Sequence, residues 1–291
     1  MQTAIQLLVT TLQIGAVYML FSLGLTLIFG IMRVVNFVHG HIFALAALLV
    51  GVLLPRIVGA GFPVYSAYLL AAVGAIVAAM LLAAVLYKFG IARYLRDLEG
   101  SFILTMGLGL FLDGIFLETF GGTVRSIAPI IEGNVSVFGA MLTTQRLVLC
   151  VVAAALTGGL FWVMSGTKLG KALRAVASDR EAAMLQGIPY DRIALIGFLL
   201  AALMAALAGV LIAPVSVVTT TTGTDYLMKS FIAIVVGGLG SVPGAIVGAL
   251  FIGVIEAVGG FYFDSSSATI AMFALVILVL LFRPKGLIPH A

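Results

Sequence analysis

The ionisable side chains that stand inside long apolar runs are the first candidates for chemistry. Asp113 lies in the run Phe102–Phe120, and Glu256 lies near the end of the run Phe231–Val258. A charged group in hydrocarbon costs at least about 2.5–3.5 kcal/mol, so it marks a place where a charged substrate, ion or proton is handled. The alternative is a structural, hydrogen-bonded carboxylate near the membrane interface. Both interpretations stay open for Asp113 and Glu256, whereas Glu118 is interpreted as structural.

A polar group between the first two apolar runs offers nitrogen ligands. Asn36, His39 and His41 lie close together, and the third histidine, His290, is at the C-terminus. Two histidines cannot complete a metal site, which needs three or four ligands. We therefore predict no metal and no cofactor. We interpret the group as a polar hinge at an unwound helix end that lines a pathway.

The composition decides which elements must position these groups. Of 291 residues, 63% are hydrophobic and 9% are charged, and the mean hydropathy is +1.28. Soluble domains carry roughly a quarter charged residues. The sequence therefore predicts an all-α, polytopic membrane helix bundle in one domain, residues 1–291. The 34 glycines allow helices to approach closely and to break inside the membrane. The single Cys150 is interpreted as a small buried residue, and the net charge of +4 indicates topology rather than nucleic-acid binding.

Apolar runs near the required length of about 20 residues define the spans. The first is too long for the apolar core of a signal peptide, so it is expected to stay as a membrane helix. The predicted spans, about eight in all, are Ile5–Ile31, Ile42–Leu54, Val64–Tyr87, Phe102–Phe120, Leu147–Ser165, Ile193–Ala213, Phe231–Val258 and Ala268–Phe282.

The distribution of basic residues predicts the orientation, since cytoplasmic loops are enriched in Lys and Arg. An external N-terminus leaves Arg56, Arg125, Arg146 and Lys229 outside. It places inside Arg33, Lys88, Arg93, Arg96, Lys168, Lys171, Arg174, Arg180, Arg192, Arg283 and Lys285. We therefore expect an external N-terminus and a cytoplasmic C-terminus.

The same orientation requires the run Phe231–Val258 to cross an even number of times, because the last span begins outside near Asp264. A re-entrant hairpin or two short helices, broken at Gly237–Gly244, meets this requirement. Irregular backbone at membrane depth must face protein or water. Gly238 and Gly240 are therefore candidates for the wall of a transport path, the alternative being a glycine packing contact.

One polar segment separates two apolar stretches, Lys168–Ile188. Ser178 stands three residues before Glu181, which is the capping-box pattern at a helix start. Gly187 is a candidate for the left-handed position after the helix, and Pro189 prevents continuation. The pattern predicts a short helix from about Asp179 to Gln186, on which another protein docks.

Enzyme signatures are absent from the sequence, including the nucleophile elbow, the zincin motif and the dinucleotide fingerprint. The stretch Ser165–Ala172 fails as a phosphate loop at its first Gly and at its final Ser or Thr. We expect no enzymatic activity here, and any ATP hydrolysis on another chain.

Three stretches of the chain carry a combined signal: Gly24–Ile31 with Val35–Gly40, Thr167–Ala175 with Glu181–Ile188, and Gly237–Ala245 with Gly248, Glu256 and Phe282–Leu287. Together they resemble one family, the inner-membrane permease subunits of branched-chain amino acid ABC importers. They span nearly the whole chain in the family's order. Two departures are His41, where many relatives carry an acidic residue, and the missing continuation after Gly187-Ile188.

The resemblance implies a bacterial inner-membrane subunit. Its partners would be ABC ATPase subunits, a second and different permease subunit, an external substrate-binding protein and membrane lipid. The cytoplasmic coupling loop would be residues 167–191, with the ATPase contact made by Ser178, Glu181, Ala182, Ala183 and Gly187. The translocation path would involve Asn36, His39, Asp113, Gly238, Gly240 and Glu256.

The function implied is passage of branched-chain amino acids, or a related small amino acid, delivered by the binding protein. Urea or short amides in the same importer class remain an alternative. An alternative of another class is a self-sufficient secondary transporter or channel, which broken helices and midmembrane carboxylates also fit. That alternative leaves the capped polar helix unexplained.

Overall fold

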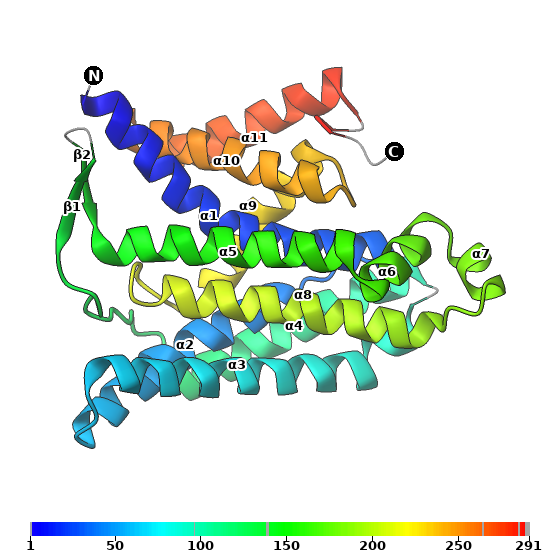
Figure 1. Ribbon diagram of the computed structural model, residues 1–291, viewed down its shortest axis with the longest axis horizontal. Coiled ribbons are helices and arrows are strands. Elements are labelled where there is room, and N and C mark those ends of the chain that lie inside the picture. Colours follow the sequence, from blue (N-terminus) through cyan, green and yellow to red (C-terminus); the bar gives the residue numbers. More distant parts are fainter. Residues whose placement is uncertain (1, 96, 138–139, 264, 285, 289–291) are drawn as a thin grey trace.

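The computed structural model describes residues 2–95, 97–137, 140–263, 265–284 and 286–288. Within these residues the chain is a bundle of long helices, as the long apolar runs of the sequence predict (Figure 1). The helices are α1 Gln2–Met32, α2 His39–Gly59, α3 Val64–Phe89, α4 Leu98–Phe120, α5 Thr144–Gly166, α6 Lys168–Ser178, α7 Arg180–Leu185, α8 Tyr190–Ile212, α9 Thr222–Gly237, α10 Val242–Tyr262 and α11 Ser265–Phe282. A short 3₁₀ turn, Ile91–Arg93, follows α3.

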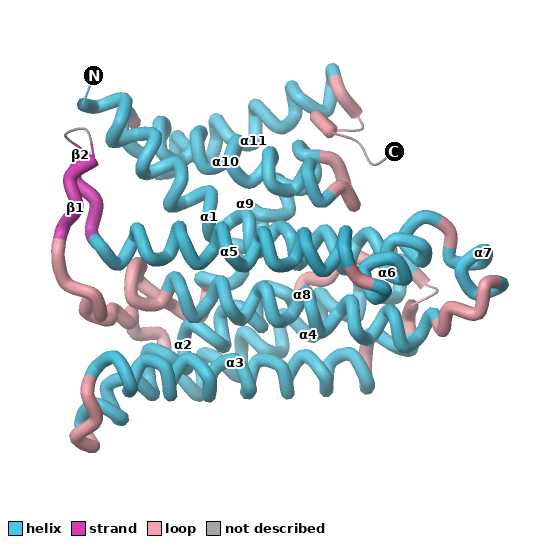
Figure 2. The backbone as a smooth tube through the Cα atoms, in the orientation of Figure 1, coloured by secondary structure: helices cyan, strands magenta, loops and turns pink. Residues whose placement is uncertain are grey.

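The bundle has two distinct ends (Figure 1). The start of α1, the α2–α3 connection and the strands β1 (Asn134–Val137) and β2 (Ala140–Thr143) lie at one end, called here the hairpin end. The α6–α7 pair and the end of α11 lie at the opposite end, called here the α7 end. Most of the loops, which are pink in Figure 2, lie at these two ends, and the remaining ones are connections that enter the bundle.

The centre of the bundle is formed by α1 and α8. α1 packs against α5, α8, α9 and α10, and most of its second half is buried. α8 presents small residues to this contact, among them Ala201, Ala202, Ala205 and Ala206, all fully buried. Small side chains let helix backbones approach closely in a membrane, where packing rather than hydrophobicity drives association.

The region Gly121–Thr144 contains structure that the all-α prediction omitted. Strands β1 Asn134–Val137 and β2 Ala140–Thr143 pair antiparallel, with Asn134 opposite Thr143. Arg125 makes a separate antiparallel bridge to Val218, which ties this region to the α8–α9 connection.

Among the described residues, seven helices are long and apolar enough to cross a membrane: α1, α2, α3 with its 3₁₀ extension, α4, α5, α8 and α10. α11 is a shorter apolar helix, and α9 has 16 residues. The predicted run Phe231–Val258 therefore corresponds to two helices, and α9 begins at Thr222, well before the predicted start.

One assignment from the sequence changes, and four residues used in the sequence arguments cannot be compared with the structure. Lys229 is not in an external loop; it lies within α9 and is half-buried. Arg96, Asp264, Lys285 and His290, which entered the topology and metal arguments, lie outside the described residues.

Candidate functional site

The α6–α7 pair protrudes from the α7 end, and both helices begin with a side-chain cap. Thr167 Oγ1 accepts a hydrogen bond from Gly170 N at 3.0 Å and begins α6. Asp179 Oδ1 accepts from Ala182 N at 3.0 Å and begins α7. These caps satisfy backbone donors that have no partner inside the helix. The predicted capping box is wrong at one position, because Ser178 ends α6 and Asp179 is the cap.

The end of α7 has the hydrogen bonds of a Schellman motif. Gly187 N donates to Met184 O at 2.9 Å, and Ile188 N donates to Ala183 O at 3.1 Å. Gly187 has φ +80°, as the sequence predicts. The helix is therefore closed at both ends by local interactions, and its shape does not depend on a docked partner.

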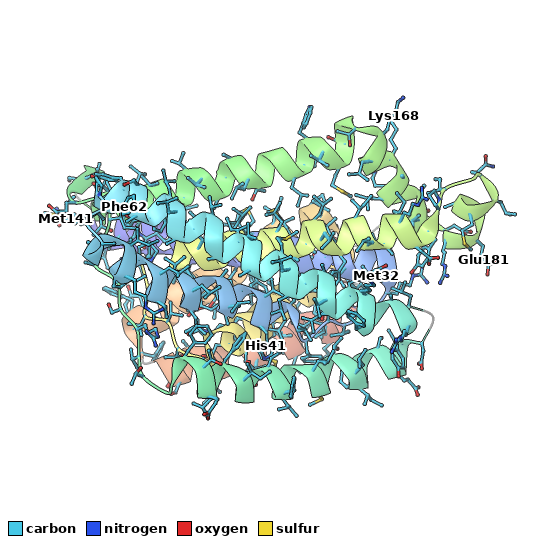
Figure 3. All side chains as sticks on the ribbon, turned by 90° about the horizontal axis from the view of Figure 1, so that it is seen from below. Met32, His41, Phe62, Met141, Lys168 and Glu181 are labelled. Atoms are coloured by element: carbon cyan, nitrogen blue, oxygen red, sulfur yellow. The ribbon has the colours of Figure 1, made fainter. Side chains whose placement is uncertain are left out.

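The exposed face of α7 is suited to contact another protein. Of the five predicted coupling residues, Ser178, Glu181, Ala182 and Gly187 are exposed, and Ala183 is buried toward the bundle. Leu185 is 87% exposed at the tip (Figure 3 shows Glu181 at the same end). Met184, which is 41% exposed, adjoins Leu185, so the end of α7 carries two neighbouring exposed apolar side chains.

A cavity of about 520 Å³ lies between α7 and the end of α1. Its lining includes Ser178 and Glu181 on one side, and Met32 and Arg33 on the other. α1 ends at Met32, and residues 33–38 then run without helical structure to α2. Arg33, the first of these residues, has φ +55°. The coupling residues thus adjoin the point where the first membrane helix ends.

The glycine-rich break separates α9 from α10 at residues 238–241. Gly238 and Gly240 have φ +116° and +82°, values that a side chain disfavours. A Cβ on Gly237 would overlap the carbonyl oxygen of Gly244, and a Cβ on Gly248 would overlap that of Ala233. Gly238 and Gly240 thus lie in the backbone break, whereas Gly237 and Gly248 make the close contact between α9 and α10.

The break faces a cavity of about 320 Å³, lined by Thr26 and Gly30 of α1, Gly240 and Ser241 of the break, and Arg174 of α6. The final carbonyls of α9 do not open into it. Leu287 N donates to Val236 O at 2.8 Å, and Ile288 N donates to Gly237 O at 2.9 Å. The C-terminal segment therefore holds the end of α9.

Asn36 and His39, two predicted path residues, are buried in this conformation. Asn36 is 1% exposed, and its Oδ1 accepts from Val38 N. His39 is fully buried with neither ring nitrogen paired, and its ring packs edge-on against Phe21. The unwound connection is as predicted, but these two side chains contact protein rather than an open cavity.

Asp113 pairs with a residue that sequence reasoning did not include in the path. His41 Nε2 lies 3.0 Å from Asp113 Oδ1, which joins α2 to α4 (Figure 3 labels His41). His41 could have been noticed from the sequence, because it is one of the two departures from the family pattern. Its pairing with Asp113 could not, because Asp113 is 72 positions away.

Glu256 is held by two partners. Tyr18 Oη donates to its Oε2 at 2.5 Å, and Lys229 Nζ donates to its Oε1 at 2.7 Å. Glu256 and Lys229 line a cavity of about 370 Å³ between α1, α10 and α11. The sequence analysis identified Glu256 as a candidate site residue, but it did not identify Tyr18 or Lys229 as its partners.

A metal site requires three or four ligands at one place. The described residues contain no group of three or more His, Cys, Asp or Glu side chains able to hold a metal ion. What they contain is a bundle of membrane-length helices with one broken pair, charged pairs within it and a capped helix outside it. These features define a polytopic membrane protein of the transport class.

The family with the description "Branched-chain amino acid transport system / permease component" matches residues 7–282. The branched-chain amino acid permease BraD of Pseudomonas aeruginosa is 30% identical over 98% of this chain and 95% of its own length. The permease LivH of Salmonella typhimurium is 32% identical over 94% of this chain and 92% of its own length. The chain belongs to this family of transport-system permease components.

A solved structure shares the fold. PsaBC from Streptococcus pneumoniae, in complex with a Fab, aligns with a TM-score of 0.51 at 18% identity, covering 98% of this chain and 93% of that chain. At this identity the likeness concerns the arrangement of helices alone.

Proposed function

We propose that this permease component forms part of the membrane path of an ABC importer and passes branched-chain amino acids from a binding protein to the cytoplasm. Family membership supports the class, and the substrates named for BraD and LivH support the choice of amino acid. The observation that carries the coupling is the exposed, doubly closed helix α7.

In this proposal the ATPase subunits contact the exposed residues Ser178, Glu181, Ala182 and Gly187, and Ala183 anchors α7 to the bundle. Their closure on ATP moves α7 and, through it, the start of α8 and the end of α1. The chain needs no catalytic residue, because a transporter works by stabilising two conformations differently.

The path would run beside the α9–α10 break and the charged pairs that include Asp113 and Glu256. Gly238 and Gly240 let the backbone turn next to the 320 Å³ cavity. Asn36 and His39, buried here, would act as the hinge between α1 and α2 rather than as contacts of the substrate in this conformation.

The orientation proposed has the α7 end in the cytoplasm of a bacterial cell and the hairpin end outside. The basic residues Lys168, Lys171, Arg174, Arg180 and Arg192 support it, because all lie in or beside α6 and α7. A binding protein would then dock at the hairpin end, and a second, different permease subunit would complete the path.

The test is uptake by proteoliposomes that contain the complete transporter with its own partner subunits. Leucine, isoleucine and valine should enter only with the binding protein outside and ATP inside. Alanine, urea and acetamide form the comparison panel. Accumulation of leucine without ATP would instead support a secondary transporter, and preference for urea or acetamide would overturn the substrate.

A further inference from the structure

The His41–Asp113 pair lies within the bundle, away from both ends. His41 is in the first turn of α2, and Asp113 stands seven residues before the end of α4. At 1.5 Å per residue this places Asp113 about 10 Å from the end of its helix. His41 is buried, whereas the Asp113 side chain is 40% exposed. The carboxylate is therefore open on one side at membrane depth.

The hydrogen bonds indicate the charge of the pair. His41 Nε2 faces Asp113 Oδ1, while His41 Nδ1 is buried without a partner. A protonated imidazole would carry a second N–H on Nδ1 with no acceptor, at the cost of an unsatisfied buried donor. A neutral His41 that donates from Nε2 avoids this cost. The pair then carries one negative charge, and Asp113 Oδ2 has no hydrogen-bond partner in the described residues.

Asp113 lies at the border between two faces of α4. The packed face is formed by Ser101, Thr105, Gly109, Leu112 and Phe116, all buried, and Gly109 and Phe116 stand four and three residues from Asp113. The open face exposes Ile103 and Leu110, about 70% each, and a Cβ on Gly107 or Gly114 would meet no atom within 4 Å. Hydrocarbon cannot cover an open carboxylate at this depth without a large cost. The exposed side of the Asp113 carboxylate must therefore border water or a charged group.

The Lys229–Glu256 pair differs from the His41–Asp113 pair in its net charge. Glu256 already accepts from Lys229 and Tyr18, so that cluster has no net charge to offer a cation. Asp113 retains a free carboxylate oxygen and a net negative charge. Among the acidic groups of the described membrane helices, Asp113 is the one that lies more than one turn inside its helix and has no Lys or Arg partner.

We propose that Asp113 binds the ammonium group of the transported amino acid on the open face of α4, with His41 as the positioning residue. Oδ2 accepts from the ammonium, while His41 holds Oδ1 and fixes the carboxylate plane. This proposal rests on the proposed function and adds the group of the substrate that is recognised.

The test uses cysteine labelling in the complete transporter, purified in nanodiscs without ATP. Cys150 is replaced by Ala, and Gly114→Cys reports on the open face beside Asp113. Leu69→Cys, on the 65% exposed face of α3, is the lipid-facing control. A water-soluble thiol reagent should label position 114 and not position 69. Leucine should slow labelling at 114, and 4-methylpentanoate, which is leucine without its ammonium group, should not.

The substitution Asp113→Asn should raise the leucine concentration needed for protection by about 10- to 100-fold, the value of one charge-assisted hydrogen bond. Asp113→Glu keeps the negative charge and should restore part of the affinity for leucine. His41→Gln, which keeps a donor, should shift protection less than Asp113→Asn. Each variant is compared after its assembly with the partner subunits has been verified.

Two results would overturn the proposal: no labelling at position 114 in a complex that transports leucine, or equal protection by leucine and 4-methylpentanoate. Leucine uptake by the Cys150→Ala complex is measured in parallel. Its absence in a correctly assembled complex counts against the proposed function, whereas normal uptake with either overturning result counts against the ammonium site alone.

Discussion

The guanidinium carbon of Arg180 lies 3.7 Å from the centre of the Tyr190 ring. Arg180 is the first residue of α7, and Tyr190 is the first residue of α8 and is buried. A cation–π contact therefore connects the start of α7 to the start of α8, a central helix of the bundle. Movement of α7 would reach the core of the bundle by this route.

Removal of this contact should weaken the transmission of movement without removing the docking surface. Arg180→Ala is expected to slow ATP-driven leucine uptake by a factor of about 2–30, which corresponds to the energy of a cation–π contact. Arg180→Lys retains a cation and should lose less. ATPase copurification should be unchanged in both variants. A normal uptake rate in Arg180→Ala would show that this contact does not carry the coupling.

The α9–α10 contact should not tolerate a side chain. Gly248→Ala places a methyl group against the Ala233 carbonyl, so we expect a loss of about 1–3 kcal/mol from overpacking and less folded protein in the membrane. Gly158→Ala on α5 is the matched control, because its Cβ meets no atom within 4 Å. Thermal melting of the two purified variants makes the comparison. Equal melting temperatures would contradict the close packing of α9 and α10.

The Lys229–Glu256 pair should show charge dependence. Glu256→Gln leaves the Lys229 ammonium without its carboxylate, and removing one partner of a fully buried pair costs about 3–5 kcal/mol. Both side chains are partly exposed, at 23% and 29%, so a smaller loss is expected. Uptake should fall more than the amount of protein in the membrane, and Lys229→Gln in the same chain should recover stability. A double variant no more stable than Glu256→Gln would argue against the pair as the cause.

The orientation of the chain is tested by labelling from each side of the membrane. In a chain with Cys150→Ala, Glu132→Cys should react with an impermeant reagent added to intact spheroplasts. Arg174→Cys should react only in inverted vesicles. Both positions are exposed and lie at opposite ends of the bundle. Reaction of both from the same side would overturn the proposed topology.

Much of the fold follows from the sequence because apolar length and turn residues are local signals. Gly187 and Pro189 end α7 where the sequence predicts. The cap was assigned one residue early, because Ser178 and Asp179 are both good caps and only the packing of α6 decides between them. Leu173 and Val176 of α6 are buried, which keeps the helix intact through Ser178.

The side-chain pairs could not be predicted in the same way. Glu256 was a candidate because a carboxylate in an apolar run is costly, but Tyr18 is 238 positions away. Lys229 was assigned to an external loop because polar residues around Asp225 obscured the start of α9. Asp113 and His41 were each noted separately, and only the packing of α2 against α4 brings them together.

The measurement that tests the account most directly is affinity purification of the tagged permease from membranes, with every accompanying chain identified by mass spectrometry. The wild-type protein should retain a stoichiometric ATPase. Gly187→Pro should lose it while still inserting in the membrane, because proline cannot adopt φ +80° and cannot donate to Met184 O. Glu181→Lys, a charge reversal on the exposed face, should also weaken retention. A permease that purifies alone and transports leucine in vesicles without ATP would contradict the account.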